Sequence, residues 1–143
     1  MVKVERTITI HAPAKKVFDY IAGTTTLPEV WPGMIEAKNV KTLPNGGHRF
    51  HWAYKMAGVR FEGDSEDVEF VANKRIVSKT KGGIDSTITW EFKPQNGDTT
   101  VVFEAEYNVP IPLVGKLAET FIAKENEHEA EALLANLKSR MET

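Results

Sequence analysis

Regularly spaced turn motifs between residues 34 and 109 constrain the fold of this chain most strongly. The motifs are PNGG, AG, ANK, KGG and QNG, at residues 44–47, 57–58, 72–74, 81–83 and 95–97. Glycine and asparagine favour the tight turns that join antiparallel strands. Apolar and polar residues alternate between the turns, as in strands with one buried face. Five turns therefore predict six consecutive antiparallel strands.

The segments on either side predict one more strand and three helices. Residues 2–11 alternate like a strand, although Arg6 falls on its apolar side, where we expect it to extend beyond the core into water. Residues 13–22 show helical spacing, and Thr26 with Glu29 has the pattern of a capping box for a second, brief helix. Residues 114–141 predict a final helix roughly 40 Å long.

The face of the final helix that meets the sheet is predicted from its apolar residues. Leu117, Phe121, His128 and Ala132 lie near one stripe, so we expect them to face the sheet. Ile122, Leu133, Leu137 and Met141 flank this stripe. Glu129 is assigned to the solvated side with the other charged residues of the helix.

One face of the predicted sheet is unusually aromatic. Residues that flank a two-residue hairpin turn point the same way, so the inner face can be followed from strand to strand. It carries Phe50, Trp52, Tyr54, Met56, Phe61, Ile88, Trp90, Phe103 and Tyr107. Small or polar residues interrupt the same face at Ser65, Ser78, Thr80, Ser86 and Ala105. A tightly filled core would favour branched aliphatic residues there, so the pattern indicates a cavity.

The alternation loses its phase once, in the segment EGDSEDVEF at residues 62–70. A β-bulge near Gly63 accounts for the break. It would turn Asp67 and Glu69 outward as solvated charges; without it they would be inward carboxylates suited to proton transfer.

Composition excludes several classes of function. The 143 residues predict one domain, 1–143. The 18 basic and 20 acidic residues are interspersed, so we expect no nucleic-acid partner. The chain has no cysteine, which removes disulfides and thiolate chemistry. Apolar runs are short, so we expect no integral membrane segment and a cytoplasmic location.

Few residues suggest catalysis or metal binding. His128, beside the predicted cavity, is a weak candidate for a general acid or base, and an exposed helix position is the simpler interpretation. His48 and His51 fall on opposite faces of one strand, so they cannot readily share a metal. No serine lies in a recognisable nucleophile motif. We therefore expect neither a metal nor a cofactor.

The opening segment ITIHAPAKKVFDYIAGTTTLPEVWPGM, residues 8–34, resembles the signature of the polyketide cyclase/dehydratase-like branch of the START-like and pollen-allergen superfamily. The order of predicted elements resembles that superfamily along essentially the whole chain. The resemblance implies an α+β helix-grip fold: a seven-stranded curved antiparallel sheet, two short helices after the first strand, and a long C-terminal helix. It also implies a cavity for lipids, sterols, polyketides or other apolar molecules, and it transfers no catalytic residue.

These observations predict a protein that binds a small hydrophobic or amphipathic ligand between the sheet and the last helix. The alternative is a cyclase or dehydratase that uses acid and base groups in the same cavity. The predicted ligand-binding residues are Trp31, Phe50, Trp52, Tyr54, Met56, Phe61, Ser78, Ile88, Trp90, Phe103, Tyr107, Leu117 and Phe121.

Overall fold

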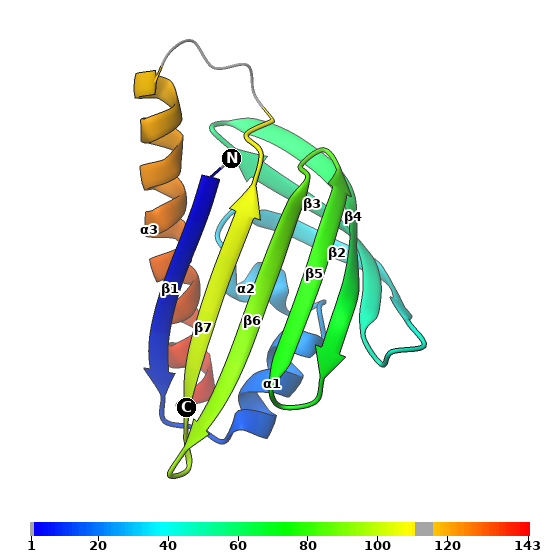
Figure 1. The fold of residues 1–143 in the computed structure, drawn as a ribbon, viewed down its shortest axis with the longest axis vertical. Helices are drawn as coiled ribbons and strands as arrows, with labels where there is room; N and C mark the ends of the chain where they lie inside the picture. Colours follow the sequence, from blue (N-terminus) through cyan, green and yellow to red (C-terminus); the bar gives the residue numbers. More distant parts are fainter. Residues whose placement is uncertain (1, 111–115) are drawn as a thin grey trace.

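The computed structural model describes residues 2–110 and 116–143, with side chains described for 2–110 and 120–143. Figure 1 shows a curved sheet with one long helix alongside and two short helices behind it. The strands are β1 (Val2–Ile10), β2 (Met34–Thr42), β3 (His48–Met56), β4 (Val59–Val71), β5 (Arg75–Gly82), β6 (Ser86–Gln95) and β7 (Asp98–Tyr107). The helices are α1 (Ala14–Ala22), α2 (Leu27–Val30) and α3 (Lys116–Met141).

The seven strands form one antiparallel sheet in the order β1-β7-β6-β5-β4-β3-β2. Strands β2 to β6 each pair with the next strand along the chain, which confirms the prediction of successive hairpins, and β7 also pairs with β1. Turn chemistry explains two of these hairpins. Ala57 and Gly58 both have positive φ, as do Asn96 and Gly97, and two-residue turns of this backbone shape match the twist of paired strands. The fold is the predicted α+β helix-grip arrangement.

The phase break of β4 lies at a different place from the predicted one. Asp67 pairs with Ser78 and Glu69 pairs with Val77, so the bulge falls at Val68 and not near Gly63. The stretch before the bulge keeps its phase, and Asp67 points inward with 4% of its surface exposed. The expectation that Asp67 is a solvated charge was therefore wrong, whereas Glu69 is exposed as expected. Alternation alone shows that a break exists; pairing with β5 decides where.

Helices α1 and α2 connect β1 to β2. Pro13 precedes the first turn of α1, and Val17, Phe18 and Ile21 are buried. The capping box expected at α2 is absent: Thr26 Oγ1 donates to the Tyr20 carbonyl, 2.6 Å away, and makes no cap bond.

Glu29, the other residue of that expected box, serves instead to connect helices. Its Oε1 accepts hydrogen bonds from Tyr20 Oη at 2.7 Å and from an Arg140 guanidinium nitrogen at 3.0 Å. These two contacts join the short helices to the end of α3.

Helix α3 packs along β1 (Figure 1), but it is rotated relative to the predicted orientation. Its buried residues are Ile122, Ala130, Leu133, Leu134, Leu137 and Met141. Phe121 is 60% exposed, so the expectation that it faces the sheet was wrong. The His128 side chain is 80% exposed, which agrees with the simpler interpretation of this residue as an exposed helix histidine. The expected helix start at Val114 and the side chain of Leu117 lie outside the described residues.

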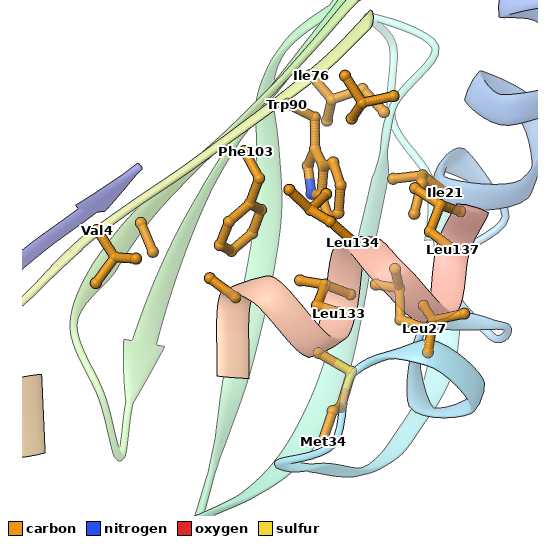
Figure 2. Close-up of a cluster of buried hydrophobic side chains, with 14 of the residues drawn as sticks. Val4, Ile21, Leu27, Met34, Ile76, Trp90, Phe103, Leu133, Leu134 and Leu137 are labelled. Carbon is orange, nitrogen blue, oxygen red and sulfur yellow. The ribbon is translucent and has the colours of Figure 1, made fainter. Parts of the chain in front are cut away.

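The apolar core lies between the inner face of the sheet and the helices. Figure 2 shows Trp90 and Phe103 pointing from the sheet toward Leu133, Leu134 and Leu137 of α3. Residues 2–110 and 116–143 include no helix long and apolar enough to cross a membrane.

Arg6 lies at the edge of this core. Its guanidinium is 3.3 Å from Glu131 and 3.5 Å from Glu127, both on α3. The side chain is about one-third exposed, so it reaches solvent as expected but is paired there.

Candidate functional site

The interior contains a cavity of about 120 Å³ between the sheet and the helices. Aromatic and aliphatic side chains from β3, β5, β6 and β7 form one wall, and α1, the α2 segment and α3 close the other. A dry apolar cavity of about 150 Å³ is known to bind benzene, so this space has the scale of a single aromatic ring. The prediction that sheet and helix enclose free space is confirmed.

Ten of the residues predicted to bind ligand line this cavity: Trp31, Phe50, Trp52, Tyr54, Met56, Ser78, Ile88, Trp90, Phe103 and Tyr107. Phe61 packs at the margin of the core and is not among the lining residues. Phe121 is excluded by its exposure. Whether the ten contact a ligand stays a prediction.

A hydrogen-bonded pair from β3 and α3 lies at one end of the cavity. Tyr54 Oη donates to Glu129 Oε2 at 2.5 Å, and the Gly33 backbone N–H donates to Glu129 Oε1 at 3.0 Å. Burial raises the pKa of Glu129, opposed by donors on Tyr54, Gly33 and Trp31. The pKa of Tyr54 is raised by burial and by the adjacent Glu129 carboxylate.

Tyr107 extends this polar end of the cavity. Its hydroxyl accepts a hydrogen bond from Asn126 Nδ2 on α3. Burial raises the pKa of Tyr107 to about 12, so the phenol remains neutral at physiological pH and can donate to a ligand.

A second carboxylate, Asp67, lines the other end of the cavity. Ser78 Oγ donates to Asp67 Oδ1 at 2.7 Å, and the His48 backbone N–H donates to Oδ2 at 2.8 Å. Asn45 Nδ2 also donates to the Asp67 carbonyl at 2.8 Å, which ties the β2–β3 turn to the bulged strand. Asp67, next to the bulge, therefore joins β4 to β5, to the start of β3 and to the β2–β3 turn.

Trp52 supplies an unused donor in the same interior. Its side chain is 4% exposed and lines the cavity, and Nε1 has no hydrogen-bond partner within the described ranges 2–110 and 120–143. Buried donors without partners are rare and costly. A ligand oxygen placed near this atom would satisfy it.

An open groove adjoins the cavity outside Glu129. It has a volume of about 580 Å³ and runs between α3, Pro32-Gly33 and the β3–β4 turn. Met56, Asn126 and Glu129 line both the cavity and the groove, so these three residues mark the mouth of the cavity. His128 lies in the groove, turned away from the cavity interior. The structure thus places this catalytic candidate outside the cavity.

The outer face of the sheet carries a separate charged cluster. His51 Nδ1 and Nε2 lie 3.2 Å from Asp64 and 3.1 Å from Glu62, and hydrogen bonding to Glu62 raises the pKa of His51. No group of three or more histidine, aspartate or glutamate side chains in the described part of the chain is arranged to hold a metal ion.

Comparison with known proteins agrees with this geometry. Residues 1–142 match the family model described as polyketide cyclase / dehydrase and lipid transport. The chain belongs to this family. The match to this polyketide cyclase/dehydrase family covers nearly the whole sequence. It agrees with the resemblance seen in residues 8–34 and in the order of the predicted elements. No curated protein matches the chain.

Solved structures share the fold at low sequence identity. The protein TTHA0849 from Thermus thermophilus is 22% identical, with a TM-score of 0.84 over 97% of this chain and 96% of that one. A START superfamily protein from Mycobacterium smegmatis is 14% identical, with a TM-score of 0.83 over 99% and 98%. The Zhui aromatase/cyclase from Streptomyces sp. R1128 is 14% identical, with a TM-score of 0.74 over 96% and 94%.

Two polar residues of the cavity were missed by the sequence prediction. Glu129 and Asn126 lie on the buried side of α3, one helical turn apart. Polar residues on a helix normally indicate its solvated side. Glu129 is expected there for this reason, and Asn126 is not among the predicted site residues. A signal does exist: Asn126, Ala130, Leu133, Leu137 and Met141 recur at spacings of three and four, a stripe that passes beside Glu129.

Proposed function

We propose that this protein binds a small hydrophobic or amphipathic molecule in the cavity between the sheet and α3. The observation that carries the proposal is the internal cavity of about 120 Å³, lined mainly by aromatic and aliphatic side chains. Close-packed interiors seldom leave voids larger than one water molecule, so a cavity of this size needs an explanation. The family description includes lipid transport, which supports the same function.

The cavity size sets the part of the ligand that can be enclosed. It accommodates about one ring or a short acyl segment, whereas binding sites for larger ligands commonly span about 300–1,000 Å³. The polar residues at the mouth and the outer groove would hold the remainder. An amphipathic molecule, with an apolar body inside and a polar group at the mouth, matches this division.

Filling the cavity tests the proposal. Ala105 is buried on the inner face of β7 and lines the cavity, so Ala105→Phe would put a phenyl ring into that space. We expect the variant to bind 2-phenylethanol at least about tenfold more weakly, since burying a phenyl-sized group is worth about 1.5–3 kcal/mol. Calorimetric titration measures the affinity, and native mass spectrometry of the purified wild type detects any retained ligand.

Val102→Phe is the matched control, because Val102 lies on the outer face of the same strand. It should leave 2-phenylethanol binding unchanged, and thermal unfolding should show that both variants are folded. Equal affinity in the wild type and Ala105→Phe, or no saturable binding by the wild type, would contradict a ligand-binding cavity.

The Tyr54–Glu129 pair supports a second candidate, acid–base catalysis in the same cavity. The 2.5 Å contact joins a carboxylate with a raised pKa to a neutral phenol. Dehydration of a β-hydroxy ketone needs a base that takes the α-proton and an acid that protonates the departing hydroxyl. Glu129 is our candidate for the base and Tyr107 for the acid, and the similarity to Zhui aromatase/cyclase supports this reaction class.

Turnover of 4-hydroxy-4-phenylbutan-2-one to its conjugated enone and water tests the second candidate. Glu129→Gln should lower the rate by about 100-fold, the lower end of the range for general acid–base catalysis. Glu125→Gln, on the groove side of the same helix, should leave the rate unchanged. A wild-type rate equal to that in buffer would exclude catalysis of this reaction while leaving the binding proposal intact.

A further inference from the structure

The charges that line the cavity are all of one sign. Among the described lining residues, Asp67 and Glu129 are the ionisable groups with an ordinary pKa below neutrality, and lysine, arginine and histidine are absent. A fatty acid or another carboxylate ligand would meet two acidic side chains and no cation. The lining therefore favours a ligand whose polar group is a donor or a cation.

Glu129 is placed to receive such a group. Its two oxygens accept hydrogen bonds from Tyr54 Oη and Gly33 N, and the Trp31 side chain is a third donor to the carboxylate. A carboxylate has about four acceptor positions, which leaves room for one more donor. The side chains of Trp31, Tyr54 and Tyr107 interact with Glu129 or with one another at this end of the cavity. An organic ammonium ion is attracted by a carboxylate and by the faces of nearby aromatic rings, and both kinds of group are present at this end of the cavity.

The position of Glu129 also limits the cost of binding a charge. Met56, Asn126 and Glu129 line both the cavity and the open groove, so an ammonium group held here keeps access to water. Charges fully removed from water carry a large desolvation penalty. Apart from Glu129, the groove is lined by Lys55, Glu125 and His128, so it carries basic as well as acidic side chains and does not itself select for anions.

The interior also offers a hydrogen-bond donor that a polar ligand atom could use. Trp52 lines the cavity, and its buried Nε1 donor has no partner in the part of the chain with described side chains. Hydrogen bonding to a neutral oxygen of the ligand would remove this deficit. The interior thus supplies a donor and the mouth an acceptor with a negative charge.

We propose that Glu129, Trp31, Tyr54 and Tyr107 form an ammonium subsite at the mouth, and that the cavity selects apolar amines over carboxylic acids. This inference rests on the proposed ligand-binding function and names the ligand class. The ammonium donates to a free acceptor position of Glu129 and lies against the aromatic rings, while the apolar body enters the cavity. A carboxylate of the same size is repelled by Glu129.

Three probes of matched size test the ammonium subsite: phenethylamine, 2-phenylethanol and phenylacetate. Titration calorimetry at about pH 8 keeps an alkylammonium protonated and a carboxylate ionised. We expect phenethylamine to bind the wild type at least about tenfold more tightly than phenylacetate, the value of one charge-assisted hydrogen bond. The affinity of 2-phenylethanol should lie between the two.

Variants locate the selectivity. Glu129→Gln should reduce the ratio of phenethylamine affinity to 2-phenylethanol affinity by about tenfold, because the substitution removes the charge that only the ammonium needs. Glu125→Gln removes the same charge from the groove side of α3 and should leave phenethylamine binding unchanged. Equal losses in the two variants would show a diffuse charge effect and overturn the subsite.

The outcomes separate this inference from the function on which it rests. If none of the three probes binds the wild type, the proposed binding cavity itself fails. If 2-phenylethanol binds and phenylacetate binds as tightly as phenethylamine, the cavity stands and the ammonium subsite is wrong. This second comparison needs only wild-type protein, so it holds even if Glu129→Gln does not fold.

Discussion

Replacing Phe92 with alanine is expected to lower the free energy of unfolding by about 3–5 kcal/mol. Phe92 is 2% exposed on the inner face of β6 and is among the largest fully enclosed side chains. The centre of its ring lies 5.3 Å from the centre of the Phe18 ring, in an edge-to-face arrangement. It lies 6.3 Å from the centre of the Trp90 ring, in a stacked arrangement. Removing it leaves an empty space where α1 meets the sheet.

Phe121→Ala is the matched control for this measurement. The residue type and the substitution are the same, but Phe121 is 60% exposed on α3. We expect a change within about 0.5 kcal/mol, as for most surface substitutions. Chemical denaturation of both variants gives the comparison. A large loss for Phe121→Ala would show that α3 has the orientation predicted from its apolar stripe and not the one described here.

Replacing Asp67 with alanine is expected to cost about 3 kcal/mol, because hydrogen bonds to charged groups contribute about 1.5–3 kcal/mol each. The carboxylate accepts hydrogen bonds from Ser78 Oγ and the His48 backbone N–H, and its residue is buried. Alanine would leave both donors without this partner and would weaken the bulge that aligns β4 with β5. The midpoint and slope of urea denaturation measure the effect.

Glu69→Ala provides the comparison on the other side of the bulge. Glu69 is exposed, and its Oε2 lies 3.2 Å from Arg75 Nε, a surface ion pair worth at most about 1 kcal/mol. If the loss for Asp67→Ala is as small as that for Glu69→Ala, both carboxylates lie in solvent. That result would restore the outward orientation expected from a bulge near Gly63.

The strands and their faces were predictable because the signals are local. Alternation has a period of two, and glycine or asparagine at a turn reflects backbone angles that other residues adopt less readily. The inner positions Trp52, Trp90 and Phe103 could therefore be followed across successive hairpins from the sequence pattern alone. Most of the cavity wall formed by the sheet follows from that pattern.

The helix wall of the cavity was less predictable. Asn126 and Glu129 are polar, yet the sheet curves so that α3 presents them to the cavity mouth, where Tyr54 and Tyr107 supply partners. A buried polar group is tolerated when such partners exist, and those partners come from strands far away in the sequence. Hydropathy along the helix cannot show them.

The amino-acid sequence by itself determined the succession of hairpins from β2 to β7, the turns, the aromatic inner face and the family resemblance, because each depends on neighbouring residues or on a contiguous motif. The tertiary structure alone decided the rotation of α3, the location of the bulge at Val68 and the pairing of Tyr54 with Glu129. Those features depend on which distant groups meet, and only the packed sheet and helix bring them together.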